Sequence, residues 1–137
     1  MRQFSLKRQK QEAELKSVVA DIRKTRGGKC EDCDSTGITD PSHNYSRKDF
    51  ASLISDSENI TLLCRRHHNA FQDNQFWNFK SDYVLRKMKD QFENEPDVFR
   101  KDRMRSHLVG KLYAAKDNAT EWGEKNPAWV DILLNEL

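Results

Sequence analysis

The chain has 137 residues, the size of one small domain or of a module with an extended arm. Charged residues make up 34% and hydrophobic residues 36%, so we expect a small core braced by a further element, or an extended helical shape. No apolar run approaches the length of a membrane-spanning helix, and the first residues lack the apolar stretch of a secretory signal. We therefore expect a cytoplasmic protein with no membrane partner.

The charge is unevenly distributed, although the net charge is only +2. Residues 1–29 sum to +6, residues 30–75 to −4 and residues 76–137 to zero. A basic segment ahead of an acidic one indicates two tasks, contact with a polyanion and binding of a cation. A basic helix can also be no more than a solvated face, so the charge pattern alone leaves both interpretations open.

The first half of the chain predicts one helix followed by short strands. Residues 3–26 have apolar positions near a 3.6-residue period in their second half, and Gly27–Gly28 provides a stop. Turn residues then become frequent, with a helix predicted from about Arg65. The strand-like pieces before that helix are residues 38–39, 43–45 and 60–63.

The second half, residues 75–137, predicts helices. Apolar stripes run from Phe76 to Phe92 and from Met104 to Ala115, and Pro96 and Asn126–Pro127 mark two helix starts around a polar loop at 118–126. The expectation is therefore an α+β, mostly helical, single integrated domain. Its parts are a basic N-terminal helix or arm (1–28), a core (29–75) and a C-terminal helical region (76–137).

Three cysteines and one histidine form two pairs with the same spacing. Cys30-x-x-Cys33 precedes Cys64-x-x-His67, and each pair supplies half of a tetrahedral site. The stretch between the pairs is poor in apolar residues, so metal binding would supply folding free energy. The sequence therefore predicts a structural Zn²⁺ held by Cys30, Cys33, Cys64 and His67.

Two alternatives accompany this prediction. Cys30 and Cys33 could form a redox pair, but the acidic neighbours Glu31, Asp32 and Asp34 are expected to raise the pKa of the thiols and blunt their reactivity. His68 directly follows His67, and neighbours on a helix point about 100° apart, so one of the two is expected to bind zinc. Zinc ligation by His68 with His67 free is the reverse assignment, which stays open here.

His43, Asn59 and His68 occur in this order around the cysteine pairs. Together with Cys30-x-x-Cys33 and the run Leu63-Cys64-Arg65-Arg66-His67-His68, they resemble the HNH (ββα-metal, zinc-knuckle) endonuclease family over about residues 29–72. The run at 42–47 is similar, more weakly, to the phage NinG/Rap branch of recombination nucleases. The resemblance implies a ββα-metal core flanked by helices, a structural zinc, a catalytic Mg²⁺ or Mn²⁺ between hairpin and helix, and DNA as the substrate.

The resemblance also implies a role for each residue. His43 would be the general base, Asn59 would keep His43 oriented through backbone hydrogen bonds, and His68 would bind the catalytic cation. Where many members have a second ligand directly before the base, this chain has Ser42, and Asp40 is the candidate replacement; a further family histidine is Gln72 here. The residues expected to contact DNA phosphates are Arg47, Lys48, Arg65 and Arg66 near the core, and Lys7, Arg8, Lys10, Arg23, Lys24 and Arg26 of the arm.

Three functions follow as hypotheses. The first is a metal-dependent DNA endonuclease that acts on branched or recombination intermediates, in the host cytoplasm if a phage encodes the chain. The second is a zinc-stabilised DNA-binding module without cleavage, and the third is a zinc-scaffolded factor that docks on a protein through residues 76–137. A homodimer is also open, because the apolar residues of 129–137 would pack either internally or across a dimer.

Overall fold

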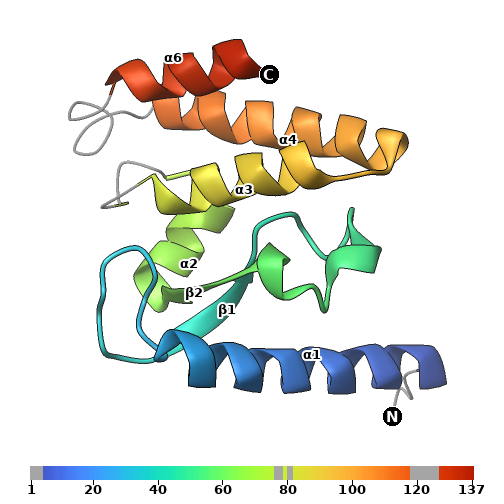
Figure 1. Ribbon diagram of the computed structural model, residues 1–137. Coiled ribbons are helices and arrows are strands. Elements are labelled where there is room, and N and C mark those ends of the chain that lie inside the picture. Colours follow the sequence, from blue (N-terminus) through green and yellow to red (C-terminus); the bar gives the residue numbers. More distant parts are fainter. Residues whose placement is uncertain (1–4, 76–78, 80–81, 118–126) are drawn as a thin grey trace.

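The computed structural model describes residues 5–75, 79, 82–117 and 127–137, and the fold is α+β and mostly helical, as predicted. A two-stranded hairpin and α2 lie between the long helix α1 on one side and the stacked helices α3, α4 and α6 on the other (Figure 1). No helix among these residues is long and apolar enough to cross a membrane. The elements are α1 (Leu6–Arg26), β1 (Thr39–His43), two 3₁₀ turns (Ala51–Leu53 and Ser57–Asn59), β2 (Ile60–Cys64), α2 (Arg65–Gln72), α3 (Tyr83–Asn94), α4 (Val98–Asp117) and α6 (Pro127–Glu136).

Helix α1 begins and ends where its sequence places the caps. The Ser5 hydroxyl accepts a hydrogen bond from the Arg8 backbone N–H, and Gly27 ends the helix in the left-handed region with φ of 82°. The apolar face in the second half of α1 packs on the hairpin side, which confirms the predicted periodicity. That contact is a small cluster of Leu15, Val18, Val19 and Ile22 with Ile54, Ile60 and Leu62.

The hairpin differs in part from the prediction. β1 and β2 pair antiparallel, with Thr39 opposite Cys64 and His43 opposite Ile60. The two predicted pieces at 38–39 and 43–45 are therefore wrong as separate strands, because one strand runs through Pro41. A proline lacks the backbone N–H, but β1 has a partner on one side only, so an edge strand tolerates it.

The C-terminal helices confirm one predicted stripe and shift another. Met104, Leu108, Leu112 and Ala115 of α4 are all buried, with exposed fractions of 1% or less. Phe79 is also buried, but it lies outside any helix, and α3 begins only at Tyr83. The predictions for Phe76 and for the loop at 118–126 fall outside the described residues.

One hydrophobic core connects the two cysteine pairs to the C-terminal helices. It includes Cys30, Leu63 and Phe71 as well as Met88 of α3 and Leu112 of α4. Full burial of a large apolar side chain contributes about 1.5–3 kcal/mol, so these contacts hold α2 firmly against α3 and α4. The position of α2 is thus set by the core on one side and by the cysteine cluster on the other.

Candidate metal centre and adjoining cleft

The four predicted zinc ligands lie together. The ligand atoms of Cys30, Cys33, Cys64 and His67 are all within 4.8 Å of one another, and Nδ1 of His67 is 3.1 Å from Sγ of Cys64 and 3.7 Å from Sγ of Cys30. With Zn–S bonds of about 2.3 Å and Zn–N bonds of about 2.0 Å, tetrahedral geometry separates neighbouring donors by about 3.5–3.8 Å. The cluster is therefore a candidate metal centre whose donors and spacings suit zinc.

The knuckle between the first two cysteines is a tight turn. The Asp34 backbone N–H donates to the Cys30 carbonyl at 2.9 Å, and Cys30 N–H donates to the Ser35 carbonyl at 3.0 Å. Asp34 adopts a positive φ of 59°, a region that aspartate tolerates better than most residues. The turn points both thiols toward Cys64, where β2 passes into α2.

A buried carboxylate supports the ring of His67 from behind. Oδ2 of Asp32 lies 3.5 Å from Nε2 of His67, and both side chains are almost completely buried. Metal-binding histidines commonly present their second ring nitrogen to a carboxylate, which fixes the ring orientation. This contact was not predicted, because in the sequence Asp32 is only a charge beside the thiols.

The cluster decides between the two adjacent histidines. The His67 ring belongs to the cluster and packs 5.3 Å from the Phe79 ring, whereas His68 faces the hairpin. The reverse assignment, with His68 at the cysteines, is therefore not the arrangement in this structure.

The two thiols of the knuckle do not behave as the charge argument predicts. Burial raises the pKa of Cys30, but backbone hydrogen bonds, led by that from Cys64, outweigh it and lower the pKa to about 7. The predicted rise is therefore wrong for Cys30. For Cys33 the pKa does rise, to about 11, but burial is the main cause and not the acidic neighbours.

A cleft of about 620 Å³ contains both His43 and His68, the residue that directly follows the cluster member His67 in α2. These residues come from β1 and α2, 25 positions apart in the chain. The side chains of its wall include Ser42 and His43 of β1, Arg47 and Asp49 of the loop after it, His68 and Gln72 of α2, and His107 and Lys111 of α4.

His43 is held in one orientation by the loop that follows β1. Its Nε2 lies 2.9 Å from the carbonyl oxygen of Ile54. Since a carbonyl can only accept a hydrogen bond, Nε2 carries the proton, and Nδ1 of the neutral ring is the basic nitrogen. Burial lowers the pKa of His43, so the ring is predominantly neutral near pH 7. A neutral, oriented imidazole in a cleft is suited to accept a proton.

Asn59 joins the two ends of that loop and is completely buried. Its Nδ2 donates to the carbonyls of Tyr45 (3.0 Å) and Leu53 (3.3 Å), while its Oδ1 accepts from the Tyr45 N–H (2.9 Å) and from Gln91 (3.0 Å). Leu53 directly precedes Ile54, the residue whose carbonyl holds His43. Asn59 therefore fixes the backbone on which the orientation of His43 depends.

His68 lies against Asp40, the residue considered as a replacement metal ligand. Nδ1 of His68 is 3.1 Å from Oδ2 of Asp40, and Nε2 is 3.2 Å from the Gln72 amide nitrogen. Arg65 also binds Asp40 through two hydrogen bonds, of 2.6 and 3.2 Å. The Arg65 guanidinium is the main reason why the pKa of Asp40 lies below its usual range. Asp40 is therefore an ionised carboxylate positioned beside an imidazole.

The basic residues predicted to contact DNA are in different situations. Arg23 donates to the side chain and carbonyl of Thr39, and Arg26 donates to the carbonyls of Ile60 and Ser57, so both fasten α1 to the hairpin. Arg47 pairs with Glu12 at the cleft. Arg23 and Arg47 are nevertheless exposed, as are Lys7, Arg8, Lys10, Lys24, Lys48, Arg65 and Arg66, and only Arg26 of the set is partly buried.

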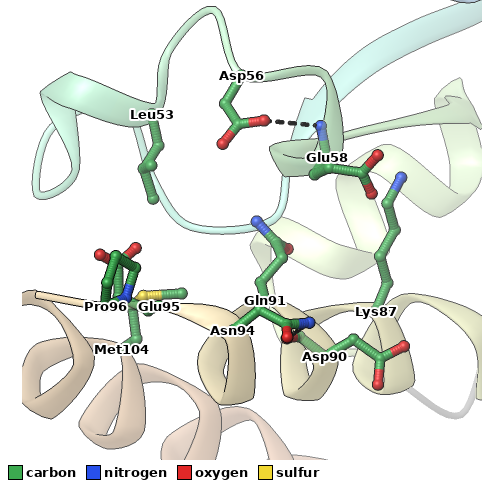
Figure 2. Close-up of a pocket in the computed structure, with 10 residues that line it drawn as sticks. All are labelled: Leu53, Asp56, Glu58, Lys87, Asp90, Gln91, Asn94, Glu95, Pro96 and Met104. Atoms are coloured by element: carbon green, nitrogen blue, oxygen red, sulfur yellow. Dashed lines mark hydrogen bonds between the residues drawn. The ribbon is translucent and has the colours of Figure 1, made fainter.

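A second hollow, of about 380 Å³, lies between the 3₁₀ turns and α3. Figure 2 shows Asp56 and Glu58 on the loop side, and Asp90 and Lys87 on α3. With Glu95 at its edge, carboxylates outnumber the one lysine among the lining residues. Such a surface repels phosphate, so the cleft with the histidines is the better candidate for a polyanion.

Comparisons with protein-family models, with curated proteins and with solved structures return no match for this chain.

Proposed function

We propose that the chain is a metal-dependent HNH endonuclease that hydrolyses phosphodiester bonds in DNA. The observation that carries the proposal is the shared cleft of His43 and His68, together with the Cys₃His cluster, whose member His67 directly precedes His68 in α2. A basic imidazole on β1, and an imidazole of α2 paired with the β1 carboxylate Asp40, are the groups that this reaction needs.

The Cys₃His cluster would hold a structural Zn²⁺. Four protein donors close a tetrahedral site and leave no position for a substrate, so zinc here would supply folding free energy and not chemistry. Its ligand Cys64 ends β2 and its ligand His67 lies in the first turn of α2. A bound ion would thereby fix the direction in which α2 leaves the hairpin, and with it the side chain of His68.

Asp40 and His68 would hold the second, catalytic cation, Mg²⁺ or Mn²⁺. Bonds of about 2.1 Å at right angles separate two ligands by about 3 Å, which agrees with the 3.1 Å between Oδ2 of Asp40 and Nδ1 of His68. Two protein ligands are enough for Mg²⁺, which keeps waters and binds substrate phosphate. Such an ion supplies charge stabilisation to the phosphorane and to the leaving oxygen.

The chain's own residues would perform the proton transfer. Nδ1 of His43 takes a proton from a water, which attacks the phosphorus, while Nε2 stays bonded to the Ile54 carbonyl. Asn59 is a positioning residue, because it reaches His43 only through the loop backbone. Arg65, Arg66, Arg47 and Lys48 lie close enough in the chain to these groups to bind flanking phosphates.

One observation favours a second candidate, a zinc-stabilised DNA-binding module without cleavage. Arg65 forms two hydrogen bonds with Asp40 and so occupies the carboxylate that a catalytic cation would need. The nuclease proposal requires Arg65 to release Asp40, for example toward a DNA phosphate. The binding-module alternative requires no such exchange.

A nicking assay separates the two candidates. Supercoiled plasmid and a four-way junction are incubated with the zinc-loaded protein and Mg²⁺ or Mn²⁺, beside His43→Ala and the exposed α2 control Asn69→Ala. General-base catalysis contributes about 10²–10⁴-fold, so His43→Ala should lose at least about 100-fold in rate while Asn69→Ala keeps it. Binding without nicking under every divalent ion would leave only the DNA-binding module.

The same assay tests the proposed preference for branched DNA. The junction and a linear duplex built from the same strands are compared at equal concentration, and we expect the junction to be cut faster. Equal cleavage rates would refute the preference for branched DNA but would not affect the proposed endonuclease activity.

A further inference from the structure

Helix α4 forms a second wall of the histidine cleft. His107 and Lys111 line the same cavity as His43 and His68. Arg103, one turn before His107, donates to the backbone carbonyl of Asp49 at 3.2 Å, and Asp49 also lines the cavity. Arg103, His107 and Lys111 follow at intervals of four residues, so they share one face of α4 with a rise of about 6 Å from each to the next.

The loop after β1 packs against this face and fixes its outer half. The Arg103 guanidinium lies 5.4 Å from the centre of the Phe50 ring, and the His107 ring meets the same ring edge-to-face at 4.9 Å. Nε2 of His107 is 3.7 Å from the Asp49 carboxylate. These contacts hold two nitrogen-bearing side chains at the rim of the cleft instead of leaving them free in solvent.

Lys111 marks the inner end of the stripe, beside the end of α2. Its ammonium donates to the Phe71 carbonyl at 2.8 Å and to Oδ1 of Asn74 at 2.6 Å, and it lies 4.3 Å from the centre of the Phe71 ring. Phe71 precedes Gln72, whose amide nitrogen is 3.2 Å from His68. Lys111 therefore lies near the end of α2, close to His68.

The environment of Lys111 favours an anion in the cleft. The Phe71 carbonyl and the Asn74 amide are uncharged acceptors, and burial lowers the pKa of the lysine to about 8, although the nearby Asp73 carboxylate acts in the opposite direction. A phosphate nearby would stabilise the ammonium form that burial disfavours. Arg103, His107 and Lys111 form a row of nitrogen-bearing side chains along one helix face. Such a row matches a ligand with repeated negative charges better than a compact anion.

We infer that the stripe Arg103–His107–Lys111 is the second half of a nucleic-acid-binding cleft, in which Lys111 contacts a backbone phosphate beside the one that faces His43. The inference rests on the proposed function for the class of ligand, DNA, but does not depend on cleavage. It assigns a binding role to α4, which lies outside the region of the HNH resemblance.

The test measures DNA affinity against salt in the zinc-loaded His43→Ala chain, which binds without cutting. Lys111→Met keeps the apolar stem of the side chain, Lys111→Arg keeps the charge, and Lys101→Met removes the same charge from another face of α4. We expect Lys111→Met to weaken binding about tenfold at low salt and to reduce the slope of log K against log salt by about 0.9, the value for one lost contact with duplex DNA. Lys111→Arg should bind within about threefold of the parent, and Lys101→Met should keep the slope.

A slope for Lys111→Met equal to that of Lys101→Met would overturn the inference, as would a lower melting temperature with an unchanged slope. Lysine acetylation of the unmutated chain, with and without DNA, tests the inference even if a variant does not fold. DNA should reduce acetylation of Lys111 at pH 8 at least about threefold and leave Lys101 unchanged, and equal labelling with and without DNA would also overturn it. If the wild type never nicks DNA but its binding depends on Lys111, only the nuclease proposal is refuted. If the wild type nicks DNA but Lys111→Met leaves the slope of log K against log salt unchanged, only this inference is refuted.

Discussion

Replacement of Asn59 by alanine tests how the loop that carries His43 is held. The Asn59 side chain is completely buried and makes four hydrogen bonds, three of them to backbone groups of Tyr45 and Leu53. Alanine fits the same backbone but offers no donor or acceptor. The substitution therefore leaves the Tyr45 N–H and the Tyr45 carbonyl without this partner, at a distance from solvent, whereas the Leu53 carbonyl keeps a hydrogen bond from the Asp56 N–H at 3.3 Å.

The expected loss of stability follows from the two Tyr45 groups that lose their partner. A buried polar group that loses its partner costs about 1–3 kcal/mol, and water entering the vacated space would offset part of this. We take about 1 kcal/mol for each group, which gives a loss of about 2 kcal/mol in the free energy of unfolding. For a chain of this length that corresponds to a fall in melting temperature of roughly 6–10 °C.

The assay is urea unfolding of the zinc-loaded protein, monitored by circular dichroism, with Asn69→Ala as the control. Asn69 lies on the exposed side of α2, so its replacement should change stability by no more than about 0.5 kcal/mol. If Asn59→Ala loses less than about 1 kcal/mol, the loop is held by something other than this amide. The account of how His43 is oriented would then be wrong.

Two further predictions concern the metal and the base. Metal binding at zinc sites of this kind contributes about 10–16 kcal/mol to the free energy of folding, which is as large as or larger than the whole unfolding free energy of most small domains. Cys64→Ser should therefore lose its zinc and unfold residues 29–72. His68→Ala should keep the zinc and the melting temperature but lose nicking. Equal loss of structure in both variants would show that the histidines are assigned wrongly. Nicking requires the neutral form of His43, whose pKa burial lowers, so the midpoint of the fall in rate with falling pH should lie below 6.5, the ordinary value for histidine. A midpoint above pH 7 in the pH–rate profile would contradict this role.

Features encoded over a few neighbouring residues were predictable from the sequence. The end of α1 at Gly27, the buried stripe of α4 and the four donors of the metal cluster all follow from spacing that one helix or one turn imposes. The strand across Pro41 was not predicted, because its tolerance of proline depends on β1 being an edge. Local spacing does not report which strands have a second neighbour.

The far side of the cleft was the least predictable part of the candidate site. His107 and Lys111 were not among the predicted site residues, because neither belongs to a motif that is visible in the sequence. Their position beside His43 and His68 results from packing of α4 on the loop at Phe50 and on the end of α2. Asp32 behind His67 is a similar case, since only the folded knuckle brings it there.

The hairpin register explains why the two histidines depend on different supports. At one end of the paired strands Thr39 lies opposite Cys64, so a bound metal would anchor the end that leads into α2 and His68. At the other end His43 lies opposite Ile60, which directly follows Asn59. Loss of the metal should therefore displace His68 first, at the start of the unfolding of residues 29–72, whereas loss of the Asn59 amide should displace His43 and leave the metal end in place. Since catalysis in the proposed mechanism needs both rings in one cleft, either displacement alone should remove most of the activity, and combining the two should remove little more.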